Sequence, residues 1–170
     1  MAVYTQRRQY GFSLVELVVV IVIIGILAAI AIPRLSRGSS GASQSAVQAN
    51  LATVRSAISM YATEHKNAFP GPDATGFKNK LTMYTDVNGT TSATKTTTCK
   101  FGPYLLTVPP CPVGENAGKT TAANVLIDST NSPPVPVTTG GEGWVYNPNT
   151  GEFLPNTTQT DDAGIAYNTY

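Results

Sequence analysis

An unbroken apolar segment near the amino terminus constrains this chain more than any other feature. From Leu17 to Ile32 every residue is Val, Ile, Leu, Ala or Gly, so no polar face remains for an amphipathic helix of a soluble protein. As a helix, the stretch from Phe12 to Ile32 is about 30 Å long, which is enough to cross the hydrocarbon core of a bilayer. The sequence therefore predicts one membrane-spanning helix.

The only charge in this segment is Glu16. A charged side chain near the centre of a membrane helix costs roughly 2.5–3.5 kcal/mol, a figure given for Asp, Lys and Arg, so we expect Glu16 to have a function and a partner. The leader before it carries Arg7 and Arg8, ends in Gly11 and has no apolar region of its own. A general secretory signal would place its apolar region before the cleavage site.

Two simpler interpretations of the amino-terminal segment are possible. Ala29-Ile30-Ala31 fits a small-residue signal-peptidase site, after which a secreted domain would begin at Ile32. Against this, Glu16 would interrupt the apolar core of the signal, and the helical pattern continues past the supposed cleavage site. The second alternative is a plain protein with a single membrane anchor, because a membrane segment alone does not exclude it.

The overall composition excludes several classes of function. Only 12% of the 170 residues are charged and the net charge is +1, so neither a basic excess for nucleic acid nor an acidic tail is present. The single histidine, His65, lies near the end of a predicted helix, and we expect an exposed or helix-capping imidazole. No nucleophile and base occur at a recognisable spacing, and no phosphate loop appears. We therefore predict a protein that is not an enzyme and needs no cofactor for catalysis.

The helix is expected to continue beyond the membrane segment. Pro33 predicts a kink or local melting, and the Gly and Ser residues at 38–41 weaken the helix again. Residues 43–63 follow a 4-3-4-3 apolar spacing that predicts one buried stripe. Phe69-Pro70-Gly71-Pro72 should stop the helix. The predicted stripe consists of Val47, Leu51, Val54, Ile58 and Tyr61.

The carboxyl-terminal two-thirds is rich in Thr, Asn, Gly, Pro and Ser. This composition favours loops and short strands over helices. Residues 156–170 are polar and are expected to be loose, with Tyr167 and Tyr170 as side chains that can dock on the domain. The other predicted elements are a short helix or strand within 77–87, a turn at Asn88-Gly89, a strand at 125–127, and a hairpin of 144–146 with 152–154.

The run Gly11-Phe12-Ser13-Leu14-Val15-Glu16-Leu17 at the head of an apolar span resembles the processing site of type IV prepilins and type II secretion pseudopilins. Three later pieces resemble the carboxyl-terminal half of the major pseudopilins. The resemblance implies an α+β, type IV pilin-like fold, in which a long amino-terminal helix packs on a small antiparallel sheet. The later pieces are Gly102-Pro103-Tyr104-Leu105, the prolines at 109, 110 and 112, and Gly143-Trp144-Val145-Tyr146-Asn147 with Thr150-Gly151-Glu152.

This resemblance also divides the chain into functional parts. The divisions are a leader peptide at 1–11, the transmembrane half of the helix at 12–33, its amphipathic half at 34–66 and a globular domain at 67–170. Prepilin peptidase of the inner membrane would cut between Gly11 and Phe12 and then N-methylate the new amine of Phe12. A residue without a side chain at Gly11 suits a protease that must approach the backbone closely.

The resemblance assigns Glu16 to assembly. Its carboxylate would pair with the Phe12 amine of a neighbouring subunit. A neighbouring ammonium at the same depth would remove much of the cost of the charge. Subunits without this partner would be penalised, which favours the correct register in a homo-oligomeric helical filament.

The implied function is that of a structural subunit of a periplasmic pseudopilus in type II protein secretion. The leader would lie in the cytoplasm and the carboxyl-terminal domain in the periplasm. Partners would be prepilin peptidase, an inner-membrane assembly platform and minor pseudopilins. A type IV pilin of a surface pilus for adhesion, motility or DNA uptake is the alternative, favoured by the Thr-rich loops and the cysteine pair. A membrane-anchored binding module that never polymerises is the third interpretation.

The location implied by the resemblance bears on Cys99 and Cys111. Disulfides persist outside the inner membrane, and we predict a bond between these two residues. It would close a loop of about 13 residues and stabilise the fold by about 3 kcal/mol in the chain-entropy model. Two free, partly buried thiols are the alternative.

Calcium is the one metal that the resemblance raises, because major pseudopilins carry a calcium site in a carboxyl-terminal loop. Calcium takes six to eight oxygen ligands, and no spacing here matches an EF-hand. Solvated loop residues are the usual explanation of such carboxylates, so we assign no ligands. The available carboxylates are Glu115, Asp128, Glu142, Asp161 and Asp162.

Overall fold

A computed structural model describes residues 12–119 and 124–170 of the chain. Its internal contacts divide it into two units, one that ends at Ser39 and one that spans Ser40–Tyr170. The backbone is helical without interruption in α1, Leu14–Glu64. The local melting considered at Pro33 therefore does not occur, because proline can keep a helical φ and removes only one backbone donor. The Gly and Ser residues at 38–41 do not interrupt the helix either, and the alternative of a kink at Pro33 stays a prediction.

The second half of α1 buries one face against the globular domain. All five residues of the predicted stripe are almost completely buried, which confirms the 4-3-4-3 pattern. The helix ends at Glu64, before Phe69 as predicted. Lys66 and Asn67 then adopt left-handed backbone conformations, with φ of 57° and 63°, and the Asn67 amide donates a hydrogen bond to the Ala62 carbonyl at 2.8 Å.

A second helix and a two-stranded sheet follow. Helix α2, Ala74–Thr82, is capped by Asp73, whose carboxylate accepts a hydrogen bond from the Gly76 amide at 2.8 Å. Strand β1, Tyr84–Thr85, pairs antiparallel with β2, Thr91–Ser92. Gly89 lies in the turn between them with φ of 81°, a conformation that glycine adopts without strain. The predicted helix or strand and the predicted turn are both present.

The main sheet has the order β3-β4-β5, with β3 at Val125–Ile127, β4 at Trp144–Tyr146 and β5 at Phe153–Pro155. Strands β4 and β5 form the predicted hairpin, in which Tyr146 faces Phe153. Strand β3 runs parallel to β4, so the sheet is mixed rather than purely antiparallel. The long connection from β3 to β4 allows this crossover, which a tight turn would not.

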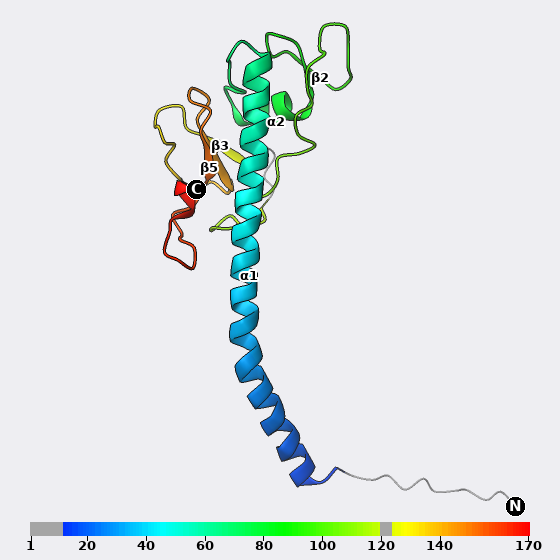
Figure 1. Ribbon diagram of the computed structural model, residues 1–170, viewed down its shortest axis with the longest axis vertical. Coiled ribbons are helices and arrows are strands. Elements are labelled where there is room, and N and C mark those ends of the chain that lie inside the picture. The colour runs from blue at the N-terminus through cyan, green and yellow to red at the C-terminus, as the bar shows by residue number, and fades with distance from the viewer. Residues whose placement is uncertain (1–11, 120–123) are drawn as a thin grey trace, which may run out of the picture. The chain divides into compact units, whose positions relative to one another are not determined.

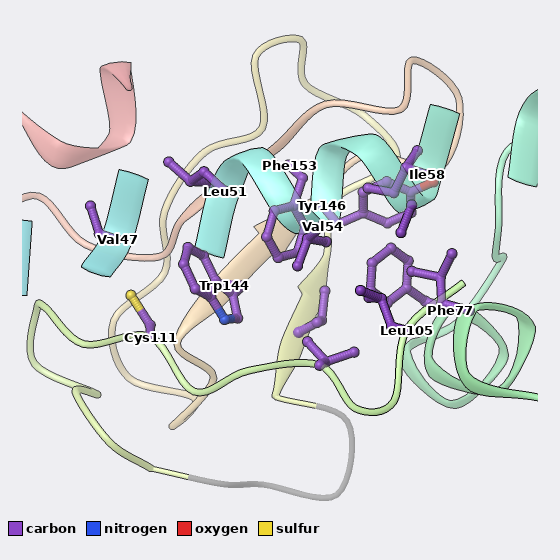
Figure 2. Close-up of a cluster of buried hydrophobic side chains, with 14 of the residues drawn as sticks. Val47, Leu51, Val54, Ile58, Phe77, Leu105, Cys111, Trp144, Tyr146 and Phe153 are labelled. Carbon is purple, nitrogen blue, oxygen red and sulfur yellow. The ribbon is translucent and has the colours of Figure 1, made fainter. Parts of the chain in front are cut away.

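The core lies between the second half of α1 and this sheet. Figure 2 shows Leu51, Val54 and Ile58 of α1 facing the aromatic side chains of β4 and β5. The ring centroids of Trp144 and Phe153 are 5.0 Å apart. The buried indole is also satisfied, because Trp144 Nε1 donates to the Pro109 carbonyl at 2.7 Å. A buried Trp with its N–H paired fixes the loop before β3 to the core.

The last fifteen residues are ordered, contrary to the expectation of a loose tail. They end in a short 3₁₀ helix, η1, Tyr167–Thr169, and Tyr167 is buried in the core as anticipated. The Arg55 guanidinium of α1 donates to the Phe153 carbonyl at 2.9 Å and to the Tyr170 carbonyl at 2.8 Å. Arg55 thus ties β5 and the tail to α1, a long-range contact that no local sequence pattern encodes. Figure 1 shows the carboxyl terminus beside β5.

Candidate processing and assembly site

The candidate site is the first turn of α1. Ser13 lies directly before the helix, and its hydroxyl oxygen accepts a hydrogen bond from the Val15 amide at 3.3 Å. The Ser13 amide donates to Glu16 Oε2 at 2.9 Å. A serine before the helix and a glutamate three residues later that reaches back to its amide resemble a capping box. The sequence pattern Ser-x-x-Glu before an apolar run is the local signal that predicts such a turn.

This geometry changes the interpretation of Glu16. Its carboxylate has a hydrogen-bond donor within its own chain, so assembly is not its only source of a partner. Glu16 also lies in the first turn of α1, where the positive end of the helix dipole stabilises an anion. The side chain is exposed, which leaves it accessible to a cation of a neighbouring chain.

The predicted cleavage position lies at the edge of the described chain. Gly11 is outside the described residues, and Phe12 is 85% exposed in front of the helix. The large apolar side chains from Leu14 to Ile30 are exposed as well. Leu14–Ala31 is long and apolar enough to cross a membrane, judged by length and composition. An exposed apolar helix of this length requires lipid or other apolar helices around it.

The predicted disulfide is absent: Cys99 and Cys111 are both free and buried. The Cys99 thiol lies 3.6 Å from the Thr90 carbonyl, beside β2. The Cys111 thiol donates to the Val113 carbonyl at 3.4 Å and belongs to the core cluster (Figure 2). The two thiols therefore occupy different environments, and burial raises the pKa of Cys111 to about 11.

His65 is buried rather than exposed, with 2% of its surface accessible. Its Nδ1 lies 2.7 Å from the Tyr61 carbonyl in the last turn of α1, so the predicted interaction with the last carbonyls is present. Its ring stacks on Tyr61 at 3.8 Å and meets the edges of Phe101 and Tyr104. His65 therefore closes the end of the helix as a core residue.

The carboxylates considered for calcium are dispersed. Within residues 12–119 and 124–170, no group of three or more His, Cys, Asp or Glu side chains is placed to hold a metal ion. Asp128 accepts hydrogen bonds from the Val135 and Thr130 amides and from Asn131, which lowers its pKa. Asp161 accepts hydrogen bonds from the Tyr170 hydroxyl and from the amides of its own loop, which likewise lowers its pKa. These two carboxylates order their own loops, and calcium binding stays a prediction.

Comparison with known proteins adds one finding. The family model of the prokaryotic N-terminal methylation motif matches residues 6–32. The curated proteins and the solved structures contain no match to this chain. The matched segment contains the predicted cleavage position, the capping turn and the whole apolar span to Ile32, and it supports the type IV pilin and pseudopilin family. The motif and the apolar helix together fit a membrane-anchored, pilin-like subunit that prepilin peptidase processes.

Proposed function

We propose that this prepilin-type chain is a structural subunit of a periplasmic pseudopilus that drives type II protein secretion. The leader 1–11 is removed between Gly11 and Phe12, and the new amine of Phe12 is methylated. The mature helix then anchors the subunit in the inner membrane with its globular domain in the periplasm. An assembly platform adds subunits from this pool to the filament, together with minor pseudopilins.

The observation that carries this proposal is the coincidence of the methylation motif with an exposed apolar helix. The motif ends where the apolar segment ends, at Ile32. A helix that needs apolar surroundings is stable either in lipid or in a bundle of identical helices, so it supports both the stored and the assembled form. Glu16 supplies the polar element that distinguishes the two forms, because a neighbour's Phe12 amine is present only in the bundle.

A surface pilus is the second candidate, and one observation favours it. Residues 93–98 of the Thr-rich loop after β2 are all exposed. Such a loop presents many hydroxyl groups to the surroundings, which suits a filament that meets external surfaces. The likeness of the hairpin segment 143–152 to the major pseudopilins favours the secretion role.

Deletion of the gene in its native host tests the choice. For a pseudopilin, the cell loses export of folded proteins across the outer membrane, and plasmid-borne wild type restores it. A Gly11→Val variant serves as the processing-site control, because a bulky side chain at this position should block the protease and the uncleaved chain should not restore export. If export is unchanged and surface filaments disappear from electron micrographs, the surface-pilus function is correct and the secretion proposal is wrong.

A further inference from the structure

The chain contains two sequences of the form Asn-x-Thr in which x is not proline. They are Asn88-Gly89-Thr90 and Asn156-Thr157-Thr158. This pattern marks an acceptor of an N-linked glycan when it lies on the surface of an exported protein. The pattern is short and also occurs by chance, so the surroundings of each asparagine in the fold decide whether a sugar can be attached to it.

Asn156 is unsuitable as an acceptor. It is only 1% exposed, and its Nδ2 atom donates hydrogen bonds to the Val137 and Glu142 carbonyls, both at 2.8 Å. Its Oδ1 atom accepts a hydrogen bond from the Val137 amide at 2.7 Å. The nitrogen that would carry the sugar is therefore buried and has both of its protons engaged, so Asn156 has a structural role.

Asn88 has the opposite surroundings. It lies in the tight turn between β1 and β2, and both Asn88 and Thr90 are exposed. In the described part of the chain, no hydrogen bond engages the side-chain amide of Asn88. The nitrogen that would carry the sugar is therefore accessible, and so is the residue two positions later that completes the pattern.

Asp86 fixes the backbone of this turn. The Gly89 amide donates to the Asp86 carbonyl at 3.0 Å, and the Asp86 carboxylate accepts hydrogen bonds from the Asn88 and Thr90 amides at 2.9 Å and 2.8 Å. All three donors are backbone groups. The turn is thus held in place without use of the Asn88 side chain, which a structural role would have engaged.

A hollow beside the turn provides room for a sugar. Its volume is about 440 Å³, and Asn88 is one of the residues that line it. Val87 and Phe101 contribute apolar surface to the same hollow, and Thr97 and Thr98 contribute hydroxyl groups. Such a lining suits a sugar ring, because the ring has apolar faces and carries hydroxyl groups at its edge.

We propose that Asn88 is the acceptor of an N-linked oligosaccharide, which is transferred to the exported globular domain. The side-chain nitrogen of Asn88 attacks the anomeric carbon of an oligosaccharide that is carried on a lipid pyrophosphate. A carbon–nitrogen bond forms, the bond from that carbon to the pyrophosphate oxygen breaks, and the lipid pyrophosphate leaves with the electron pair. The nitrogen loses one proton to a base of the transferase, so the step needs neither an oxidant nor a reductant.

This modification goes beyond the proposed function. It requires that the globular domain is exported, and a pseudopilin and a surface pilin both meet this requirement. Absence of the glycan would therefore leave the proposed function standing, because loss of protein export on gene deletion is measured independently of it.

The full-length chain, purified from membranes of its native host, provides the test. Trypsin cuts after Lys80 and Lys95 and releases the acceptor turn in the peptide 81–95. We expect mass spectrometry to find an oligosaccharide on this peptide, with fragmentation placing it on Asn88. The peptide that contains Asn156 should have its unmodified mass.

Variants expressed in the same host identify the attachment chemistry. Asn88→Gln and Thr90→Ala should each lose the added mass, whereas Thr90→Ser should keep it, because serine supplies the same hydroxyl group. Thr158→Ala is the matched control. It removes the second Asn-x-Thr sequence by changing an exposed side chain, and the glycan on the peptide 81–95 should remain.

Three results would overturn the proposal. The first is an unmodified Asn88 in the native protein. The second is a glycan that persists in Asn88→Gln, since it would then be attached to a hydroxyl group. The third is loss of the glycan from the peptide 81–95 in Thr158→Ala, which would show that the acceptor is not selected by its own turn.

Discussion

The first turn of α1 allows the two roles of Glu16 to be separated. Glu16→Gln removes the charge but keeps a side chain that can occupy the third helical position of a capping box, where Glu and Gln both function. Ser13→Ala does the opposite, because it removes the hydroxyl that accepts the Val15 amide and leaves the carboxylate in place. The two variants therefore test pairing and capping independently.

The free-energy costs expected for the two variants differ enough to be distinguished by their filament yields. Loss of a serine cap costs about 0.5–2 kcal/mol, and part of this is regained because the Ser13 amide still reaches Glu16. Loss of one partner of a buried ion pair costs about 3–5 kcal/mol, which corresponds to more than a hundredfold in an equilibrium constant. We expect Glu16→Gln to lose nearly all filaments and Ser13→Ala to retain a substantial fraction.

The assay is the filament yield after co-expression with the assembly genes, normalised to the amount of processed subunit in the membrane. Both variants should insert and be cleaved, because neither adds a charge to the span. Wild-type yield from Glu16→Gln would refute the pairing with the Phe12 amine. Equal losses in the two variants would show that Glu16 acts chiefly as a cap.

Three further predictions concern the globular domain. Under denaturing, non-reducing conditions an alkylating reagent should label both Cys99 and Cys111, and protection of both would instead demonstrate a disulfide. Trp144→Ala should lower the free energy of unfolding by about 3–5 kcal/mol, measured by chemical denaturation in detergent, and a loss below 1 kcal/mol would contradict the core described above. The pKa of Asp161 is lowered by the hydrogen bond from Tyr170, so its stabilisation is present above the unfolded pKa of about 3.9 and is lost as pH falls through the folded value. Asp161→Asn should therefore release the tail to proteolysis at neutral pH and show less additional release in acid than wild type, and an unchanged tail at neutral pH would argue against this anchor.

Elements with a local signal were predicted from the sequence. The stripe on α1 follows from apolar periodicity, and its end at Glu64 follows from the Phe-Pro-Gly-Pro segment that comes after it. The β4–β5 hairpin follows from two apolar runs joined by Asn147-Pro148-Asn149-Thr150-Gly151. In each case the residues that determine the element are adjacent or nearly adjacent in the chain, so a short stretch of sequence is enough to predict the element.

Elements that depend on distant contacts were missed or wrong. In the parallel pairing of β3 with β4, Val125 lies opposite Trp144. These residues are too far apart in the sequence for a local pattern to predict that they pair. The tail appeared loose because its residues are polar, yet Arg55 and Gln44 of α1 supply the partners that order it. The disulfide was inferred from compartment alone, and only the fold places the two thiols in separate environments.

The same distinction applies to the candidate site. Phe12, Ser13 and Glu16 form a contiguous motif, so the site was located from the sequence. The capping bond from the Ser13 amide was equally local and was available from the Ser-x-x-Glu pattern. Of the two alternatives for His65, the helix-capping one is present, whereas its burial was not predicted because it depends on Phe101 and Tyr104, which come from a different part of the chain.

The mass of the mature protein tests the central claim most directly. The chain is purified from membranes of cells that contain prepilin peptidase, and its intact mass and amino-terminal peptide are determined by mass spectrometry. We predict that residues 1–11 are absent and that Phe12 carries one added methyl group on its amine. A mature terminus at Ile32 would show an ordinary secretory signal, and an uncleaved chain that begins at Met1 would show a plain membrane anchor; either result would contradict a prepilin-type filament subunit.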